Sequence, residues 1–242
     1  MSAAPAFEFH DRLPSTSDRA IALAQQGAPP WTAVLAREQT AGRGRHGRRW
    51  LGGPGNLFLS VVLDPRVAPL SAWWSFAAAV ATVESLSPWL DDPAALRLKW
   101  PNDLFLNGAK AGGILIEAGG SKGSEGSWVV AGIGVNLVHA PVDAGQATIA
   151  LAARAPMLPP VEQIAGAIVR GLQAWAAVLA EGGLAALLST WQSYANAPGT
   201  PLTVRLARTT LQGRYLGLGA DGALLLEAAD GTRHRIVVGE VL

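Results

Sequence analysis

Apolar residues form two patterns along the first 196 residues, helical spacing and short continuous runs, and together these patterns predict an α+β domain. Apolar positions recur at helical spacing after Ser15-Thr16-Ser17-Asp18, which offers N-cap residues, and over residues 71–90, 161–180 and 184–196. Short continuous apolar runs between these segments are typical of buried strands. The predicted strands cover residues 32–37, 56–63, 96–100, 104–106, 114–116 and 128–137. Helices and strands in this mixed order indicate an α+β architecture.

The pattern changes after Ala197-Pro198-Gly199, where only short strand-like segments follow. Asp-Gly turns at Asp221-Gly222 and Asp230-Gly231 join two pairs of them. The segments cover residues 202–206, 210–218, 223–227 and 234–238. We therefore predict two domains, one over residues 1–196 and a small β-barrel over residues 197–242.

One loop concentrates the basic residues of the chain. In Gly42-Arg43-Gly44-Arg45-His46-Gly47-Arg48-Arg49-Trp50, three glycines alternate with four arginines and the run ends on a tryptophan. Glycine lets the backbone approach a ligand, converging N–H groups bind anions, and guanidinium groups bind phosphate or carboxylate through paired donors. The same run is also compatible with a solvated loop or a nonspecific nucleic-acid-binding segment.

Composition narrows these alternatives. The net charge is only +1 with 15% charged residues, whereas a protein that coats nucleic acid usually carries a larger excess of positive charge. The absence of cysteine excludes disulfides and thiolate chemistry, and the four histidines have no metal-ligand spacing, so we predict no bound metal site. Residues 1–12 lack the apolar core of a signal peptide, and no uncharged apolar run is long enough to span a bilayer. We expect a cytoplasmic protein.

Further polar and glycine motifs lie at predicted strand ends. Lys99-Trp100-Pro101-Asn102-Asp103 ends a strand at proline, although Pro-Asn-Asp also suits a simple turn. Asn107-Gly108 is the strongest hairpin signal in the chain, and Lys110 follows it, placed either to enter a pocket or to extend into water. Gly112-Gly113 and Gly132-Ile133-Gly134-Val135-Asn136 indicate a close backbone approach by a ligand, or bulges in the strands.

Taken in order, these motifs resemble those of the biotin protein ligases. The resemblance rests on the basic run, Lys99–Asp103, Lys110 with Gly113-Ile114-Leu115-Ile116-Glu117, and Gly132–Asn136, and it continues into Gly222–Glu227 and Gly239-Glu240. It implies a catalytic domain similar to class II tRNA synthetases, with a mixed β-sheet and helices, followed by an SH3-like β-barrel. It also implies ATP-dependent formation of biotinyl-5′-AMP and transfer of biotin to a carrier lysine, with biotin, ATP and Mg²⁺ as ligands.

The same resemblance implies a role for individual residues. Lys110, Arg45 and Asp103 would be catalytic, with Lys110 bridging the biotin carboxylate and the α-phosphate. The residues that would bind biotin are Ser15, Thr16, Gln39, Arg43, Lys110, Gly113 and Ile114. The residues that would bind ATP or the adenylate are Gly42, Arg43, Gly44, Arg45, Arg48, Trp50, Asn102 and Asn136.

The resemblance also sets expectations about partners. The acceptor would be the biotin carboxyl carrier domain of acetyl-CoA carboxylase or a related carboxylase, and a homodimer stays open because relatives occur as monomers and as dimers. Some relatives carry an N-terminal DNA-binding domain; here the catalytic motifs begin at Ser15, so we expect no DNA binding and no repressor function. Ser17 stands where the family often has asparagine. The alternatives are a lipoate or octanoate ligase, a nucleic-acid-binding module, and a protein that binds biotin without chemistry.

Overall fold

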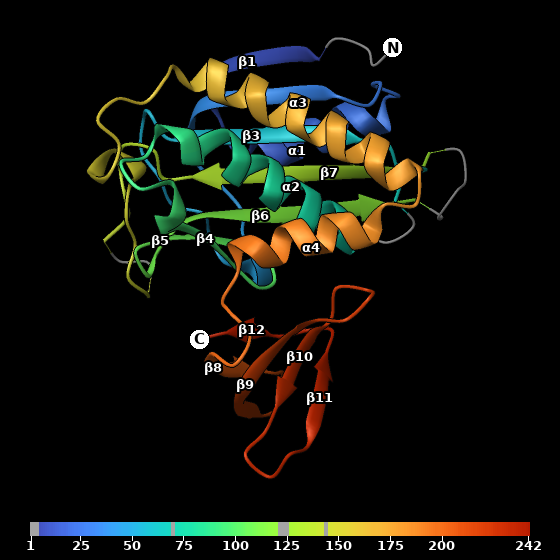
Figure 1. Cartoon of the computed structure of the whole chain (residues 1–242). Coiled ribbons are helices and arrows are strands. Elements are labelled where there is room, and N and C mark those ends of the chain that lie inside the picture. Colours follow the sequence, from blue (N-terminus) through green and yellow to red (C-terminus); the bar gives the residue numbers. More distant parts are fainter. Residues whose placement is uncertain (1–4, 69–70, 121–125, 143–144) are drawn as a thin grey trace.

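A seven-stranded mixed sheet forms the larger part of the molecule (Figure 1). The computed structural model describes residues 5–68, 71–120, 126–142 and 145–242. Strand β1 runs parallel to β2, and every other neighbouring pair in this sheet is antiparallel. In spatial order the strands are β1 (Ala6–Leu13), β2 (Thr32–Gln39), β3 (Leu57–Leu63), β7 (Trp128–Val135), β6 (Ala109–Gly119), β5 (Asp103–Leu106) and β4 (Leu96–Lys99).

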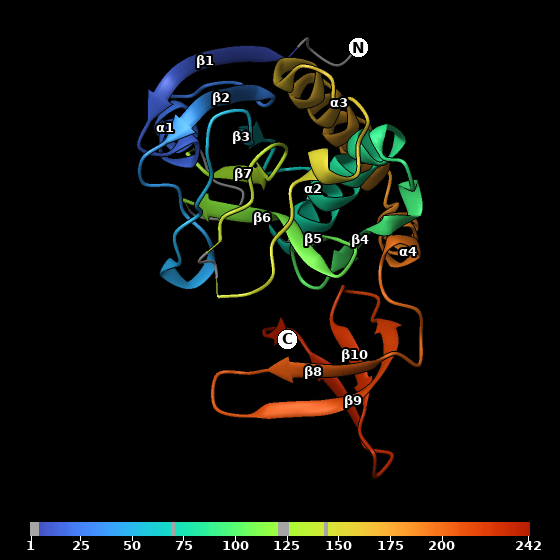
Figure 2. The same ribbon diagram turned by 90° about the vertical axis from the view of Figure 1, so that its left-hand side faces the viewer.

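Helices cover both faces of this sheet, and Figure 2 shows the resulting three layers. Helix α1 (Thr16–Gln25) lies alone on one face, where its Ala20 packs against Val34, Val62 and Val130 of the sheet. The opposite face carries α2 (Ser71–Leu86), α3 (Val161–Ala180) and α4 (Leu184–Tyr194). These three helices bury the large apolar core, in which Trp74, Leu172 and Trp191 are almost fully buried. The predicted α+β architecture is confirmed.

Helix α3 is the one described helix long and apolar enough to cross a membrane by length and composition. Its inner face is nevertheless packed: Ile164, Ile168 and Leu172 are fully or almost fully buried in the core shared with α2. Glu162 and Arg170 lie along the same helix. This is the pattern of a core helix in a globular domain.

Most predicted elements are present, and the differences have local causes. The hairpin at Asn107-Gly108 is confirmed, with both residues at positive φ (51° and 77°) between β5 and β6. Helix α2 ends at Leu86 instead of residue 90, because Pro88 starts a separate 3₁₀ turn, Ser87–Trp89. Strand β1 was not predicted, because its polar residues obscure the alternation of apolar and polar positions. One of these polar residues, Glu8, forms an ion pair with Arg19 of α1. Three further short 3₁₀ turns are Arg45–Gly47, Pro93–Ala95 and Leu151–Ala153.

The C-terminal segment forms a second, five-stranded antiparallel sheet (Figure 1). Its strands are β8 (Pro201–Arg205), β9 (Thr210–Leu218), β10 (Leu224–Glu227), β11 (Arg233–Ile236) and β12 (Glu240–Val241), in the order β11-β10-β9-β8-β12. The two-residue strand β12 was not predicted. The indole N–H of Trp100 donates to the Gly222 carbonyl (3.2 Å), and the Leu218 amide donates to the Gln192 side chain (2.8 Å). These contacts hold the second sheet against the end of β4 and against helix α4.

Candidate functional site

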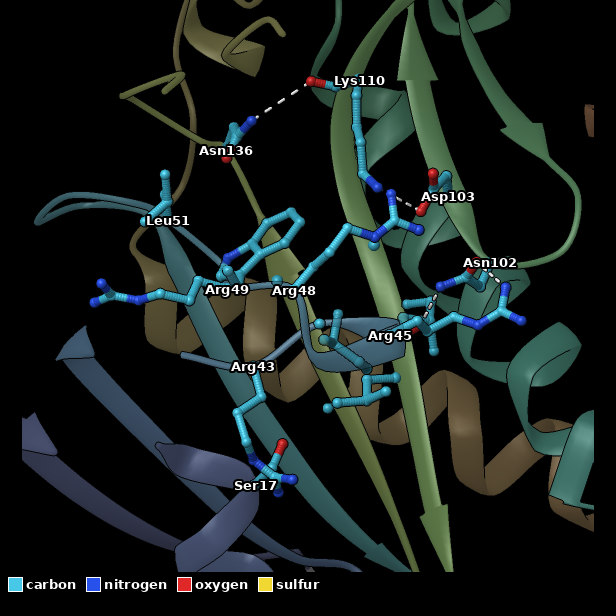
Figure 3. Close-up of a pocket in the computed structure, with 18 of the residues that line it drawn as sticks. Ser17, Arg43, Arg45, Arg48, Arg49, Leu51, Asn102, Asp103, Lys110 and Asn136 are labelled. Carbon is cyan, nitrogen blue, oxygen red and sulfur yellow. Dashed lines mark hydrogen bonds and ion pairs between the residues drawn. The ribbon is translucent and has the colours of Figure 1, made fainter. Parts of the chain in front are cut away.

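A cavity of about 340 Å³ opens between the sheet, the start of α1 and the basic loop (Figure 3). Its wall also includes Glu240 and Val241 of β12. Thirteen of the fifteen residues predicted from the sequence line it, namely Thr16, Gln39, Arg43, Gly44, Arg45, Arg48, Trp50, Asn102, Asp103, Lys110, Gly113, Ile114 and Asn136. The fold therefore brings together predicted residues that lie up to 120 positions apart in the chain.

The other two predicted residues, Ser15 and Gly42, lie behind the wall. The Ser15 hydroxyl caps α1 by accepting from the Asp18 amide (3.3 Å), which leaves Thr16 and Ser17 to face the cavity. Gly42 carries the start of the basic loop: its carbonyl accepts from the Trp50 amide (2.9 Å), and a Cβ there would lie 2.7 Å from the Trp50 carbonyl oxygen. Both residues shape the site without lining it.

The basic run folds back on itself as a tight loop. Arg43 and Arg49 form an antiparallel bridge, and the Gly44 amide donates to the Arg48 carbonyl (2.7 Å). At the tip, His46 and Gly47 have positive φ (57° and 72°), which lets the chain reverse within three residues.

All four arginines of the loop line the cavity, and each reaches a different neighbour: Arg49 donates to the Thr40 carbonyl (3.1 Å). Arg45 donates to Asn102 (3.0 Å), Arg43 ion-pairs with Asp18 and Glu117 (2.7 Å each), and Arg48 ion-pairs with Glu240 (2.8 Å). Burial lowers the pKa of Arg45, with partial compensation by the charges of Asp103 and Glu240. Asp18, Glu117 and Glu240 were not assigned to the site from the sequence, because an isolated acidic residue carries no local signal of its partner.

Lys110 and Asp103 form the most enclosed ion pair of the cavity. The lysine Nζ lies 2.7 Å from a carboxylate oxygen of Asp103, and the two side chains are 16% and 14% exposed. Strand register explains the encounter, because Asp103 pairs with Gly113 across β5 and β6, on the strand that carries Lys110. Figure 3 shows Lys110 extending from β6 toward Asp103, with Arg45 and Asn102 next to each other further along the cavity. A cation and a carboxylate are thus paired in the cavity, and the charge of Asp103 also acts on Arg45.

Glycines let the indole of Trp50 lie against the sheet. Gly113 and Gly134 face each other across β6 and β7, and a Cβ at Gly134 would lie 2.6 Å from the Trp50 indole nitrogen. The Lys110 ammonium lies 5.9 Å from the centre of the indole ring. The close approach predicted for these glycines is therefore made here by the side chain of Trp50.

Two amide side chains mark opposite ends of the cavity. Asn136 is almost fully buried, its Oδ1 has no hydrogen-bond partner among the residues that the structure describes, and its Nδ2 makes one long contact of 3.5 Å to the Lys110 carbonyl. At the other end, the Gln39 carbonyl oxygen accepts from both the amide and the hydroxyl of Thr16 (2.7 and 3.0 Å). A buried polar atom without a partner is costly unless a ligand supplies one.

The comparison with known proteins agrees with this geometry. The model of the biotin/lipoate A/B protein ligase family matches residues 9–136, which include more than half of the chain and most of the lining residues. The chain belongs to this family. The resemblance inferred from the sequence motifs is thereby confirmed, and the biotin/lipoate ligase motifs coincide with the walls of the cavity.

Individual members of the biotin/lipoate ligase family match along most of their length. The chain is 37% identical to the biotin–acetyl-CoA-carboxylase ligase of Paracoccus denitrificans, over 95% of this chain and 97% of that protein. It is 34% identical to the bifunctional ligase/repressor BirA of Bacillus subtilis (strain 168), over 93% of this chain and 70% of that protein. A solved biotin protein ligase from Aquifex aeolicus, in complex with biotin and ATP, shares the fold: TM-score 0.83, 23% identity, 98% and 97% of the two chains.

Proposed function

We propose that this protein is a biotin protein ligase, which activates biotin with ATP and transfers it to a lysine of a carrier protein. The observation that carries the proposal is a single cavity that joins a basic loop, the Lys110–Asp103 pair and a polar end formed by Thr16, Ser17 and Gln39. The basic part suits a triphosphate and a carboxylate, and the polar end suits an uncharged head group.

In the first step, a carboxylate oxygen of biotin attacks the α-phosphorus of ATP, a new C–O–P link forms, and pyrophosphate leaves. The reactants are both anions, so the barrier includes their mutual repulsion. Lys110 lies in the cavity where it can contact an oxygen of the biotin carboxylate and an oxygen of the α-phosphate, while Arg45 and Arg48 approach from the loop. Fixed cations at this position orient the reactants and stabilise the charge that accumulates in the transition state.

In the second step, the carrier lysine attacks the acyl carbon, its nitrogen forms an amide bond, and AMP leaves with the bonding electrons. The attacking amine must lose a proton. Asp103 is the carboxylate of the cavity nearest to Lys110, and we assign it to accept or attract this proton. No covalent bond to the protein is required in either step.

The adenine and the metal belong to the ATP end of the cavity. Asn136 offers a free amide oxygen there, which suits the exocyclic amino group of adenine. We propose that Mg²⁺ enters bound to the ATP phosphates and neutralises part of their charge. Within the described ranges, no group of three or more His, Asp or Glu side chains is gathered to hold a metal ion independently of a ligand.

The remaining proposals concern the molecular context. The acceptor would be the biotin carboxyl carrier domain of acetyl-CoA carboxylase or a related carboxylase, in the cytoplasm. Residues 1–196 would form the catalytic domain, and residues 197–242 an SH3-like barrel whose Glu240 reaches the basic loop. A homodimer is compatible with this arrangement.

The test is formation of the acyl adenylate. The purified chain is incubated with Mg²⁺, α-labelled ATP and either biotin or lipoate, and the products are resolved. We expect biotinyl-5′-AMP and pyrophosphate with biotin only. Lys110→Ala should lower this rate by about 10²- to 10³-fold, while Arg66→Ala, which breaks an exposed pair with Asp64, should not. A lipoate-dependent adenylate would change the substrate, and biotin binding without any adenylate would leave only a binding protein.

A further inference from the structure

Ser60 lies directly behind the polar end of the cavity, without lining it. It sits in the middle of β3, has no exposed surface, and is in register with Gly132 of β7. Its hydroxyl lies 2.8 Å from the hydroxyl of Thr16 and 3.1 Å from that of Ser17. A Cβ at Gly132 would lie 2.6 Å from the Ser17 oxygen, so the glycine lets the start of α1 approach Ser60.

The hydrogen bonds of this group have one consistent direction. The Gln39 atom that faces Thr16 accepts from a backbone amide, so it is the carboxamide oxygen, and the Thr16 hydroxyl must donate to it. With its proton used, Thr16 can only accept from Ser60. Ser60 then has no proton left for Ser17, so the Ser17 hydroxyl donates to Ser60.

This direction determines what the cavity offers to a ligand. The Gln39 amide nitrogen is left as a hydrogen-bond donor, because both observed bonds use its oxygen. The hydroxyl groups of Thr16 and Ser17 already donate their hydrogen bonds to Gln39 and Ser60, so toward a ligand their oxygens can act only as acceptors. A cyclic urea presents one carbonyl acceptor and two N–H donors, which is the complementary set. A ring without N–H groups would leave these buried polar atoms unpaired, at a cost that strongly disfavours it.

We propose that Ser60 is a positioning residue that makes the polar end of the cavity selective for a cyclic urea. It donates a hydrogen bond to Thr16 and accepts one from Ser17, and it touches no ligand itself. This inference rests on the proposed function, since the cyclic urea is the head group of biotin. Ser60 lies outside every sequence motif described above, and only its burial against the start of α1 reveals it.

The test is Ser60→Ala, measured by calorimetric binding of biotin and of desthiobiotin, which keeps the urea ring and lacks the thioether. Loss of the Ser60 hydroxyl should weaken the binding of biotin and of desthiobiotin by the same factor, about tenfold, because each ligand loses an oriented hydrogen-bonding partner. ATP binding should not change, and the biotin KM for adenylate formation should rise with kcat preserved. Ser60→Cys keeps the volume with a weaker donor, so its effect should be intermediate.

Thr82→Ala is the matched control. Its hydroxyl is also fully buried but donates to the Ala78 carbonyl inside α2 (2.6 Å), away from the cavity. It should lower thermal stability comparably and leave biotin binding unchanged. Unchanged biotin binding in Ser60→Ala, or an equal loss of ATP binding, would overturn the role of Ser60. Absence of biotin binding in the parent protein would instead overturn the proposed function, and the inference with it.

Discussion

Arg48 and Glu240 form an ion pair of 2.8 Å although 192 positions separate them in the chain. Arg48 belongs to the basic loop, and Glu240 belongs to the last strand of the second sheet. Burial alone would raise the pKa of Glu240, but the hydrogen bond from Arg48 and the charges of Arg48 and Arg205 hold it below its ordinary value. The carboxylate is therefore charged at neutral pH, and the ion pair joins the C-terminal sheet to the basic loop.

Removing the charge of Glu240 should loosen this loop. We expect Glu240→Gln to raise the KM for ATP about fivefold, corresponding to about 1 kcal/mol for a partly exposed pair. Glu227→Gln is the control, because Glu227 pairs with Arg233 in the same sheet and far from the loop. Initial rates of adenylate formation at varied ATP measure the effect. An ATP KM equal to that of the control would show that the pair does not hold the loop.

Adding one methyl group at Gly134 should displace Trp50. The new Cβ would lie 2.6 Å from the indole nitrogen, so the ring must move off the sheet. We expect Gly134→Ala to lower kcat/KM for adenylate formation about tenfold, in line with overpacking costs of about 1–3 kcal/mol. Initial rates of adenylate formation at varied biotin and ATP measure the effect.

Gly166→Ala is the corresponding control for Gly134. It adds a methyl group inside α3, where only the flexible end of Arg170 lies within reach (3.3 Å). Alanine favours the helix, so stability should rise slightly and activity should not change. If Gly134→Ala retained full activity, contact between Trp50 and the sheet would not matter for the reaction.

Acid should weaken the attachment of β1 to α1. The hydrogen bond from Arg19, partly opposed by burial and aided by His10, lowers the pKa of Glu8 to about 2. A lowered carboxyl pKa stabilises the fold above the unfolded value, near 4.5, and this stabilisation is lost as pH falls toward 2. Glu8→Gln should therefore lower the free energy of unfolding while the carboxyl is charged in both the folded and the unfolded chain, above about pH 5. The difference from the parent should then shrink on further acidification, and a difference independent of pH down to pH 3 would contradict this assignment.

Local sequence patterns predicted those helices and turns whose own residues favour the observed structure. The hairpin at Asn107-Gly108 and helix α3 (Val161–Ala180) follow from turn chemistry and from an apolar stripe, and both are present. Strands β1 and β12 were missed for a common reason. Both depend on polar or very short segments that become strands only through a neighbour, β2 in one case and β8 in the other.

Within the cavity, the sequence alone indicated the chemistry through a basic glycine-rich loop, the Lys99–Asp103 motif and a lysine at a strand start, in the order typical of one ligase family. Which carboxylate pairs with which basic residue became known only from the tertiary structure. Each of Arg43, Arg48 and Lys110 meets a carboxylate, and two of the four pairs join residues more than 70 positions apart. Such pairing depends on strand register and on contact between the two sheets, which no local pattern encodes. Ser60 shows the same limit, because its role arises from burial against a helix 43 positions earlier.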